Sequence, residues 1–301
     1  MPEISHPFDK PGSWLKGNLH THTTRSDGAK SPVDAVQWYA DNGYDFVVLT
    51  DHRRAPEKED LASPRAGFLV IPGTELDFVD RETKLAHHVV CIGVDDHIRL
   101  PESVTIQEAI DIAVAGSDLA YVAHPYWFGH DFSAYRNLQG HSGIEIYNAT
   151  CEYLCCKGDS VAYWDALLKD ESLFGFAADD AHWNRKDYGA AWVNVKSESL
   201  TREAITSALK AGQFYSSTGP AIETLELDES GVYIKTSPVD RIGLIGPGPG
   251  GRVVAASKGE TISEAEFKFD GRVGPAAKYL RLQAVDQHGK AAWTNPIVWN
   301  D

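Results

Sequence analysis

Histidines and carboxylates recur in this sequence at spacings that suit metal binding. His20 and His22 alternate along the chain, and Asp180 and His182 repeat that spacing with one carboxylate. Side chains at i and i+2 on an extended segment point to the same side, so each pair can offer two ligands to one ion. Imidazole and carboxylate ligands together are typical of Zn, Mn or Fe sites. Further residues of this kind stand at Asp51, His52, Glu75, His88 and His124.

The elements that must position these side chains alternate between strand and helix. Short apolar runs predict strands at residues 14–19, 46–49, 68–71, 89–92, 119–123, 143–147, 174–178 and 191–195. Amphipathic stretches predict helices at residues 33–42, 106–115, 160–169 and 201–211. This alternation, with buried strands, predicts an α/β fold built on a parallel sheet or barrel. The candidate ligands follow predicted strands, except that His88 opens its strand, and the ends of the strands are where α/β barrels carry their active sites.

Each of these residues also has an ordinary structural interpretation. A single histidine after a strand is commonly a loop residue, and Asp51 or Asp180 could cap the segment that follows. Asp27 with Gly28 could form only a turn. These interpretations would have to hold together at every one of the strand ends. We therefore prefer metal binding, in which a carboxylate such as Glu75 bridges two ions that share a hydroxide.

The sequence pattern changes after about residue 220. Short alternating segments at 225–227, 232–236, 242–245, 267–269, 279–285 and 297–299 are separated by turn-forming clusters. This pattern predicts a small antiparallel β-sandwich. The glycine-rich stretch 246–251 lacks the Lys-Ser/Thr ending of a phosphate-binding loop, so we interpret it as a turn. We expect two domains, at residues 1–219 and 220–301.

The order of the candidate ligands resembles that of the PHP superfamily, which is named for polymerase and histidinol phosphatase domains. The resemblance covers about residues 14–218 and includes the stretch 20–28 (HTHTTRSDG). It also includes Thr50-Asp51-His52, Gly73-Thr74-Glu75-Leu76, His88 with Gly93, Ala123-His124-Pro125 and Asp180-Ala181-His182. The stretches 16–19 (KGNL), 145–148 (EIYN) and 214–220 (FYSSTGP) are similar to a narrower branch, that of the carbaryl-hydrolase-like metallohydrolases.

The resemblance implies a distorted (β/α)7 barrel of PHP type with a trinuclear metal centre of manganese, iron or zinc, followed here by the β-sandwich. One ion would bind His20, His22, Glu75 and Asp180, a second would share Glu75 and add His88 and His124, and a third would take Asp27, His52 and His182. Some family members have His in place of Asp27, so the chain holds two or three divalent ions according to the loading of the third site. His87 neighbours His88, and the spacing to Gly93 favours His88.

Several residues beside the ligand motifs are candidates for contact with substrate. Arg25, Arg53 and Arg185 could bind an anionic group, or they could be surface charges. The aromatic residues Tyr126, Trp127 and Trp183 could line the pocket or pack over the rim of the barrel.

The favoured function is hydrolysis of a small phosphate mono- or diester by attack of a metal-bound hydroxide. His52, Asp180 and His182 are the expected catalytic residues, and His182 or His52 could protonate the leaving oxygen if no third ion occupies it. An alternative is metal-dependent hydrolysis of a carbamate, ester or amide, which the branch resemblance supports. A second alternative is a non-catalytic metal-containing binding module.

The composition restricts the class of partner. With 43% hydrophobic and 24% charged residues, the chain has the make-up of an ordinary globular protein. Its net charge of −15 argues against long nucleic acid and anionic membrane as partners, and favours a small-molecule substrate. The chain has no apolar run of about 18 residues, and residues 1–16 lack a signal-peptide core, so we expect a cytoplasmic protein. The spacing of the four cysteines argues against a disulfide framework and a zinc-thiolate site. The oligomeric state stays open.

Overall fold

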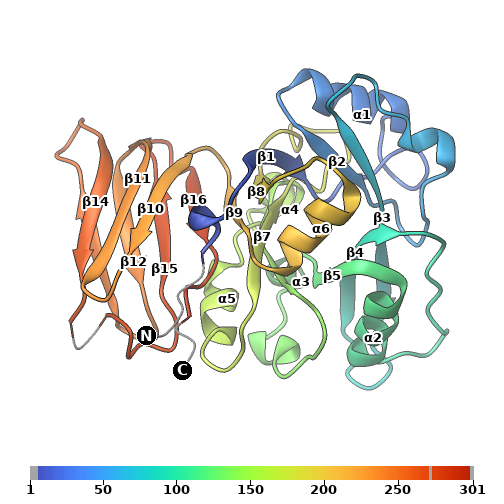
Figure 1. Ribbon diagram of the computed structural model, residues 1–301. Helices are drawn as coiled ribbons and strands as arrows, with labels where there is room; N and C mark the ends of the chain where they lie inside the picture. Colours follow the sequence, from blue (N-terminus) through green and yellow to red (C-terminus); the bar gives the residue numbers. More distant parts are fainter. Residues whose placement is uncertain (1–5, 271–272, 299–301) are drawn as a thin grey trace.

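Strands and helices alternate through the N-terminal two thirds of the protein (Figure 1). The structure is a computed structural model that describes residues 6–270 and 273–298. The strands of this part are β1 (Ser13–Asn18), β2 (Phe46–Leu49), β3 (Leu69–Val79), β4 (Ala86–Val94), β5 (Ser117–Val122), β6 (Gly143–Asn148), β7 (Phe174–Ala178), β8 (Trp192–Ser197) and β9 (Phe214–Ser217). The helices are α1 (Pro32–Asp41), α2 (Ile106–Gly116), α3 (Pro125–Phe128), α4 (Ala149–Cys155), α5 (Val161–Leu167) and α6 (Arg202–Lys210), with short 3-10 turns η1 (Pro7–Asp9), η2 (Lys58–Leu61) and η3 (Phe132–Tyr135).

Three of the four predicted helices, α1, α2 and α6, begin at residues whose side chains cap them. Ser31 accepts a hydrogen bond from the backbone of Asp34 at the start of α1, and Pro32 occupies the first helical position. Thr105 and Glu108 form a capping box at the start of α2. Helix α4 was not predicted, although with seven residues it is as long as the predicted α5. Its cap is Asn148, the last residue of β6, whose side chain accepts from the backbone of Cys151.

The first seven strands lie in consecutive order within a 13-stranded sheet, from β1 to β7. Four neighbouring pairs are parallel, namely β1–β2, β2–β3, β5–β6 and β6–β7. Strand β4, in contrast, is antiparallel to both β3 and β5, because a short turn rather than a helical crossover joins it to β3. In the described part of the chain, one bridge between Thr21 and Ala181 links the ends of β1 and β7. The structure therefore confirms a mixed α/β fold with a large sheet, whereas the distorted (β/α)7 barrel that the resemblance implies stays a prediction.

The C-terminal part adds a second layer of antiparallel strands. These are β10 (Ile222–Leu227), β11 (Gly231–Val239), β12 (Arg241–Ile245), β13 (Gly251–Ala255), β14 (Ile262–Lys268), β15 (Arg281–Val285) and β16 (Ala291–Thr294). Strands β10, β11 and β14 form a separate three-stranded sheet, whereas β16, β15, β12 and β13 continue the large sheet beyond β9. Apolar residues of both sheets form one buried cluster between them. The large sheet runs across residues 219 and 220, so the division of the chain there stays a prediction.

Three strands were not revealed by the sequence pattern. Strands β9, β13 and β16 are four or five residues long and were not predicted. Of the strand expected at residues 297–299, Ile297 forms a single bridge with Leu280, and Trp299 lies outside the described residues.

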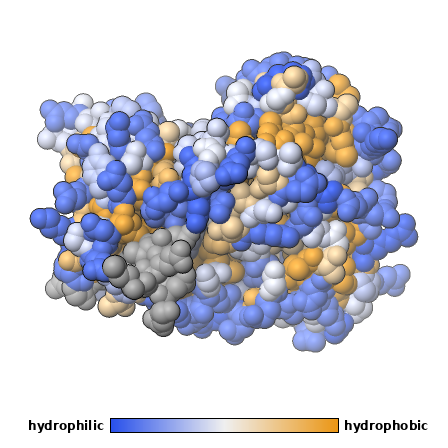
Figure 2. All heavy atoms as spheres, viewed as in Figure 1, coloured by the Kyte–Doolittle hydropathy of each residue, from blue (hydrophilic) through white to orange (hydrophobic). Residues whose placement is uncertain are grey.

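Hydrophilic residues cover most of the face shown in Figure 2, with apolar patches among them. Within residues 6–270 and 273–298, no helix combines the length and the apolar character needed to cross a membrane.

Buried hydrogen bonds join the C-terminal part to strand β7. The side-chain oxygen of Asn295 accepts from the backbone N–H of Gly175 at 3.1 Å, and its amide donates to the carbonyls of Gly212 and Phe214 at 3.2 and 3.1 Å. Ser216 donates to the carbonyl of Gly175 at 2.7 Å. Both backbone groups of Gly175 are therefore satisfied by side chains from outside the first seven strands.

We predict that Asn295→Ala lowers the free energy of unfolding by about 3 kcal/mol, because it leaves one backbone N–H and two carbonyls buried without partners. Urea denaturation followed by circular dichroism measures this. The exposed Gln37→Ala variant serves as control, with an expected change within about 0.5 kcal/mol. Equal stability of the two variants would show that Asn295 does not join the parts in this way.

Candidate metal centre

The ends of the strands bring the predicted ligands to one edge of the sheet. His20 and His22 follow β1, His124 follows β5, and Asp180 and His182 follow β7. The backbone of Asp180 and of His124 lies at positive φ, 54° and 26°, a conformation that non-glycine residues adopt rarely and that is frequent at functional sites.

Two predicted ligands lie inside strands rather than after them. Glu75 falls within β3, because this strand continues to Val79 as a hairpin with β4. His88 stands opposite Asp77 near the start of β4. Since β4 runs antiparallel to β3, its first residues reach the same edge at which the parallel strands end. The direction of β4 explains why the one ligand that opens its strand still joins the others.

Four buried side chains form the first group of possible ligands, His20, His22, Glu75 and Asp180. The Nε2 atoms of the two histidines are 3.2 Å apart. Asp180 Oδ1 lies 3.3 and 3.0 Å from these atoms, and Glu75 Oε2 lies 3.3 and 3.2 Å from them. Ligands about 2.0 Å from a central zinc ion in tetrahedral geometry are separated by about 3.3 Å. The four atoms therefore have the spacing of a single coordination shell.

The hydrogen bonding of this group also fits a cation. Asp180 Oδ1 is buried and accepts no hydrogen bond from the residues that the structure describes. A buried carboxylate oxygen without a hydrogen bond is costly, and a divalent ion would compensate it. Burial lowers the pKa of His20, but the carboxylates of Asp180, Glu75 and Glu145 outweigh burial and raise that pKa well above its ordinary value. A metal ion bound here would take the place of the proton that the carboxylates otherwise favour.

Glu75 faces two sets of imidazoles with its two carboxylate oxygens. Oε2 belongs to the first group and also lies 3.2 Å from His52 Nδ1. Oε1 lies 2.7 Å from His88 Nδ1 and 3.1 Å from His124 Nε2, the partners expected around a second ion. His52 with Glu75 and His88 forms another group of possible ligands, which the sequence did not indicate. This arrangement suits a carboxylate that bridges two ions.

The third group consists of His22, Asp27, His52 and His182. Asp27 Oδ2 lies 3.3 Å from His182 Nε2 and 3.6 Å from His52 Nε2. His182 Nδ1 donates to the carbonyl of Asp180 at 2.8 Å, which leaves Nε2 free to bind a metal. A neutral imidazole offers only one lone pair, and His22 and His52 each face two groups. His22 and His52 therefore cannot each serve both of their groups through the same lone pair, and Asp27 and His182 are the ligands that only the third group contains. Whether an ion occupies the third group stays a prediction.

Buried residues that contact the possible ligands from behind orient them. Glu145 lies in β6 with no exposed surface, and its Oε1 is 3.0 Å from His20 Nδ1. Its Oε2 accepts from the backbone of His124 at 2.9 Å and from the amide of Asn148 at 2.7 Å, and the same amide lies 3.1 Å from Asp180 Oδ2. Glu145 holds His20 so that Nε2 faces the first group. Sequence reasoning noted the stretch 145–148 as a motif but gave these side chains no role.

Two other residues near the ligand motifs have structural roles. Asp51 accepts from the backbone and hydroxyl of Thr23 and from the hydroxyl of Ser26, so it holds the loop between His22 and Asp27. His87 is buried on the other side of β4 from His88, and its ring packs edge-on against those of His130 and Tyr135. Burial, with a smaller effect from His130, lowers the pKa of His87 to about 4. This placement agrees with the preference for His88 as a ligand.

A cavity of about 320 Å³ opens onto the ligand groups. Its lining outside the possible ligands comprises Trp127, Thr150, Cys151, Leu154, Asn184 and Arg185. Of the arginines expected to contact substrate, Arg185 is the one that lines it. Arg25 donates to both carboxylate oxygens of Asp60, and Arg53 donates to both oxygens of Asp77.

Of the aromatic residues expected to line the pocket, one does so and two do not. Trp127 lines the cavity, whereas Trp183 is buried against Trp38, Tyr39 and Tyr188 and donates to the carbonyl of His22 at 3.0 Å. Tyr126 is exposed and is not part of the lining.

The arrangement can now be compared with known proteins. A two-domain protein from Bacteroides vulgatus that contains a predicted PHP-like metal-dependent phosphoesterase matches with a TM-score of 0.52 and 16% identity, over 98% of each chain. An amidohydrolase from Chromobacterium violaceum matches with a TM-score of 0.44 and 16% identity, over 66% of this chain and 96% of that one. The DNA polymerase/3'-5' exonuclease PolX of Bacillus subtilis is 25% identical over 37% of this chain. No known family model matches the chain.

The comparison with the Bacteroides protein bears on the fold. The two proteins share it over nearly the whole of both chains, which agrees with the PHP-like fold that the sequence resemblance implies. The match to the polymerase spans 23% of that enzyme's length. The activity of the polymerase as a whole is therefore not transferred to this protein.

We predict that Glu145→Gln weakens Mn²⁺ binding about 10- to 100-fold. The carboxylate of Glu145 can only accept from His20 Nδ1, whereas the glutamine amide can also donate and so does not fix the tautomer of His20. Equilibrium dialysis with elemental analysis measures the Kd and the number of ions bound. Glu198→Gln, which removes an exposed carboxylate, is the matched control and should bind as wild type does. A Kd for Glu145→Gln equal to that of the control would show that Glu145 does not position His20.

Proposed function

We propose that this protein is a metal-dependent phosphoesterase that hydrolyses a small phosphate mono- or diester. The observation that supports this most is the combination of a buried cluster of imidazoles and carboxylates with a cavity that reaches them and contains Arg185. Divalent ions held by these groups would lower the pKa of a water ligand and neutralise charge on phosphoryl oxygens. Manganese, iron and zinc all accept this set of ligands.

The residues of the cavity have separate roles in this proposal. Among the described lining residues, Arg185 is the one with a guanidinium or ammonium group, and no hydrogen bond or ion pair with the described residues occupies it. It would bind the phosphoryl oxygens that the ions leave free. His182 or His52 would donate a proton to the leaving oxygen when not engaged by an ion of the third group. Asp180 would bind the ion held by the first group.

The size of the cavity and the charge of the protein support a small substrate. At about 320 Å³, the cavity is near the lower end of the range for small-molecule sites. The net charge of −15 disfavours the approach of a long polyanion. We therefore propose a small phosphate ester as the partner rather than nucleic acid or membrane.

A second candidate is hydrolysis of a carbamate, ester or amide by the same ions. The apolar part of the cavity lining, Trp127, Cys151 and Leu154, is the observation that favours it, since an uncharged substrate would suit such a wall. A binding module without catalysis is the weaker alternative, because the cavity gives a small molecule access to the possible ligands.

The experiment that tests the proposal is hydrolysis by the Mn-loaded protein of an aryl phosphomonoester, an aryl phosphodiester and an aryl carbamate. We expect turnover of a phosphate ester, abolished in Asp180→Asn together with part of the bound metal. Turnover of the carbamate alone would replace phosphoryl by carbonyl chemistry. Wild-type activity in Asp180→Asn would refute the cluster as the active site.

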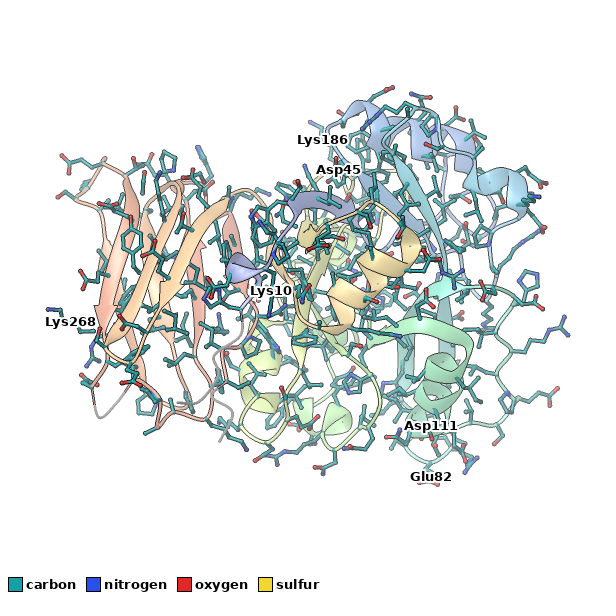
Figure 3. The ribbon with its side chains drawn as sticks, in the orientation of Figure 1. Lys10, Asp45, Glu82, Asp111, Lys186 and Lys268 are labelled. Carbon is teal, nitrogen blue, oxygen red and sulfur yellow. The ribbon has the colours of Figure 1, made fainter. Side chains whose placement is uncertain are left out.

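We further predict that Arg185→Ala lowers kcat/KM for the phosphate ester about 10- to 100-fold, through loss of a charge-assisted hydrogen bond. Lys186→Ala is the matched control, because Lys186 is the next residue and lies at the surface (Figure 3), outside the cavity lining. Steady-state kinetics should show the control within about twofold of wild type. Equal effects of the two substitutions would mean that Arg185 acts only through the general charge of the surface.

A further inference from the structure

One face of helix α4 forms an apolar wall of the cavity beside the ligand groups. Thr150, Cys151 and Leu154 line the cavity, and their spacing of i, i+1 and i+4 places them on one side of the helix. The hydroxyl of Thr150 donates to the carbonyl of Asp180 at 2.6 Å, so this face of α4 is fixed against the metal centre. Leu154 is 49% exposed although it lines the cavity, so it presents apolar surface to whatever enters.

Trp127 contributes the second apolar surface. Its ring packs edge-on against that of His124 at 5.1 Å and that of His88 at 6.1 Å, so it lies over the histidines expected around the second ion. Asn184 and Arg185, which also line the cavity, lie two and three residues after His182 of the third group in the chain. The cavity is therefore polar and cationic beside His182 and apolar beside His88, His124 and α4.

We propose that the leaving group of the substrate is an apolar, ring-sized alcohol that packs against Trp127 and Leu154. This inference rests on the proposed phosphoesterase function and adds the substrate class to it. A ring would remove the exposed apolar surface of both side chains from water. A polyol would leave hydroxyls against these side chains without hydrogen-bond partners. Hydrolysis breaks the bond between phosphorus and the ester oxygen, water supplies the hydroxyl that phosphorus gains, and the released alcohol takes the proton.

The test compares benzyl phosphate with glycerol 2-phosphate, each as the monoester and the methyl diester, on the Mn-loaded protein. Both leaving groups are alkyl alcohols, so a difference in kcat/KM reports contact with the wall rather than leaving-group acidity. We expect wild type to prefer the benzyl ester about tenfold or more, and Leu154→Asn to lose about tenfold on the benzyl ester alone. Tyr153→Asn is the control, since Tyr153 is the neighbouring residue on α4, is 51% exposed and does not line the cavity.

Binding separates failure of this inference from failure of the proposed function. Calorimetry with benzylphosphonate and 2-hydroxyethylphosphonate, which are not hydrolysed, should show tighter binding of the benzyl compound to wild type and a loss of that preference in Leu154→Asn. Turnover of phosphate esters without a benzyl preference would overturn the inference and leave a phosphoesterase. A benzyl preference in binding without turnover of any phosphate ester would support the wall and overturn the proposed function. Equal affinity for the two phosphonates would overturn the inference whatever the activity.

Discussion

The burial of Glu75 among imidazoles is the constraint on which the rest of the centre depends. Its carboxylate is almost without exposed surface, and each oxygen faces a different set of histidines. Its backbone is held on both sides, by pairing with Val90 of β4 and by a bridge with His52 after β2. This pairing on both sides fixes the place of the Glu75 backbone, and with it the point from which the side chain enters the cluster. Concentrating so many titratable groups in a dry site is unfavourable unless a cation compensates them, which is the physical reason to assign the cluster to metal.

Buried apolar runs were the part of the fold most accessible from sequence. Strands β2 and β7 have the predicted bounds, because each is buried and ends at a polar ligand motif. Strand β3 was predicted to end at residue 71, yet it continues to Val79, since pairing with β4 rather than a continuous apolar run extends it. The antiparallel direction of β4 follows from the short turn that joins it to β3. Long-range pairing of this kind leaves no periodic signal in a local window.

The order of the ligands along the chain predicted that they lie together in one centre. It did not predict that His22 and His52 each face two groups of possible ligands. That sharing depends on which ring nitrogen faces which carboxylate, and this follows from tertiary contacts. Glu145 carried a signal that was overlooked. A carboxylate within the apolar run of β6 is rarely fully buried without a partner, so its position alone indicated one. For the arginines, in contrast, position in the sequence was misleading. Arg25 and Arg53 are close to ligands in the chain, yet their guanidinium groups pair with Asp60 and Asp77.

Strand β7 shows why the C-terminal part bears on the metal centre. β7 is the edge strand of the large sheet, and one bridged pair rather than a ladder joins its end to that of β1 among the described residues. An edge strand has backbone groups that need partners. Ser216 and Asn295 supply them at Gly175, five residues before Asp180, through side chains that belong to β9 and to the segment after β16. The extension of the sheet thus completes the hydrogen bonding of the strand that precedes Asp180 and His182, and among the described residues it does so through side chains rather than through a further strand pair.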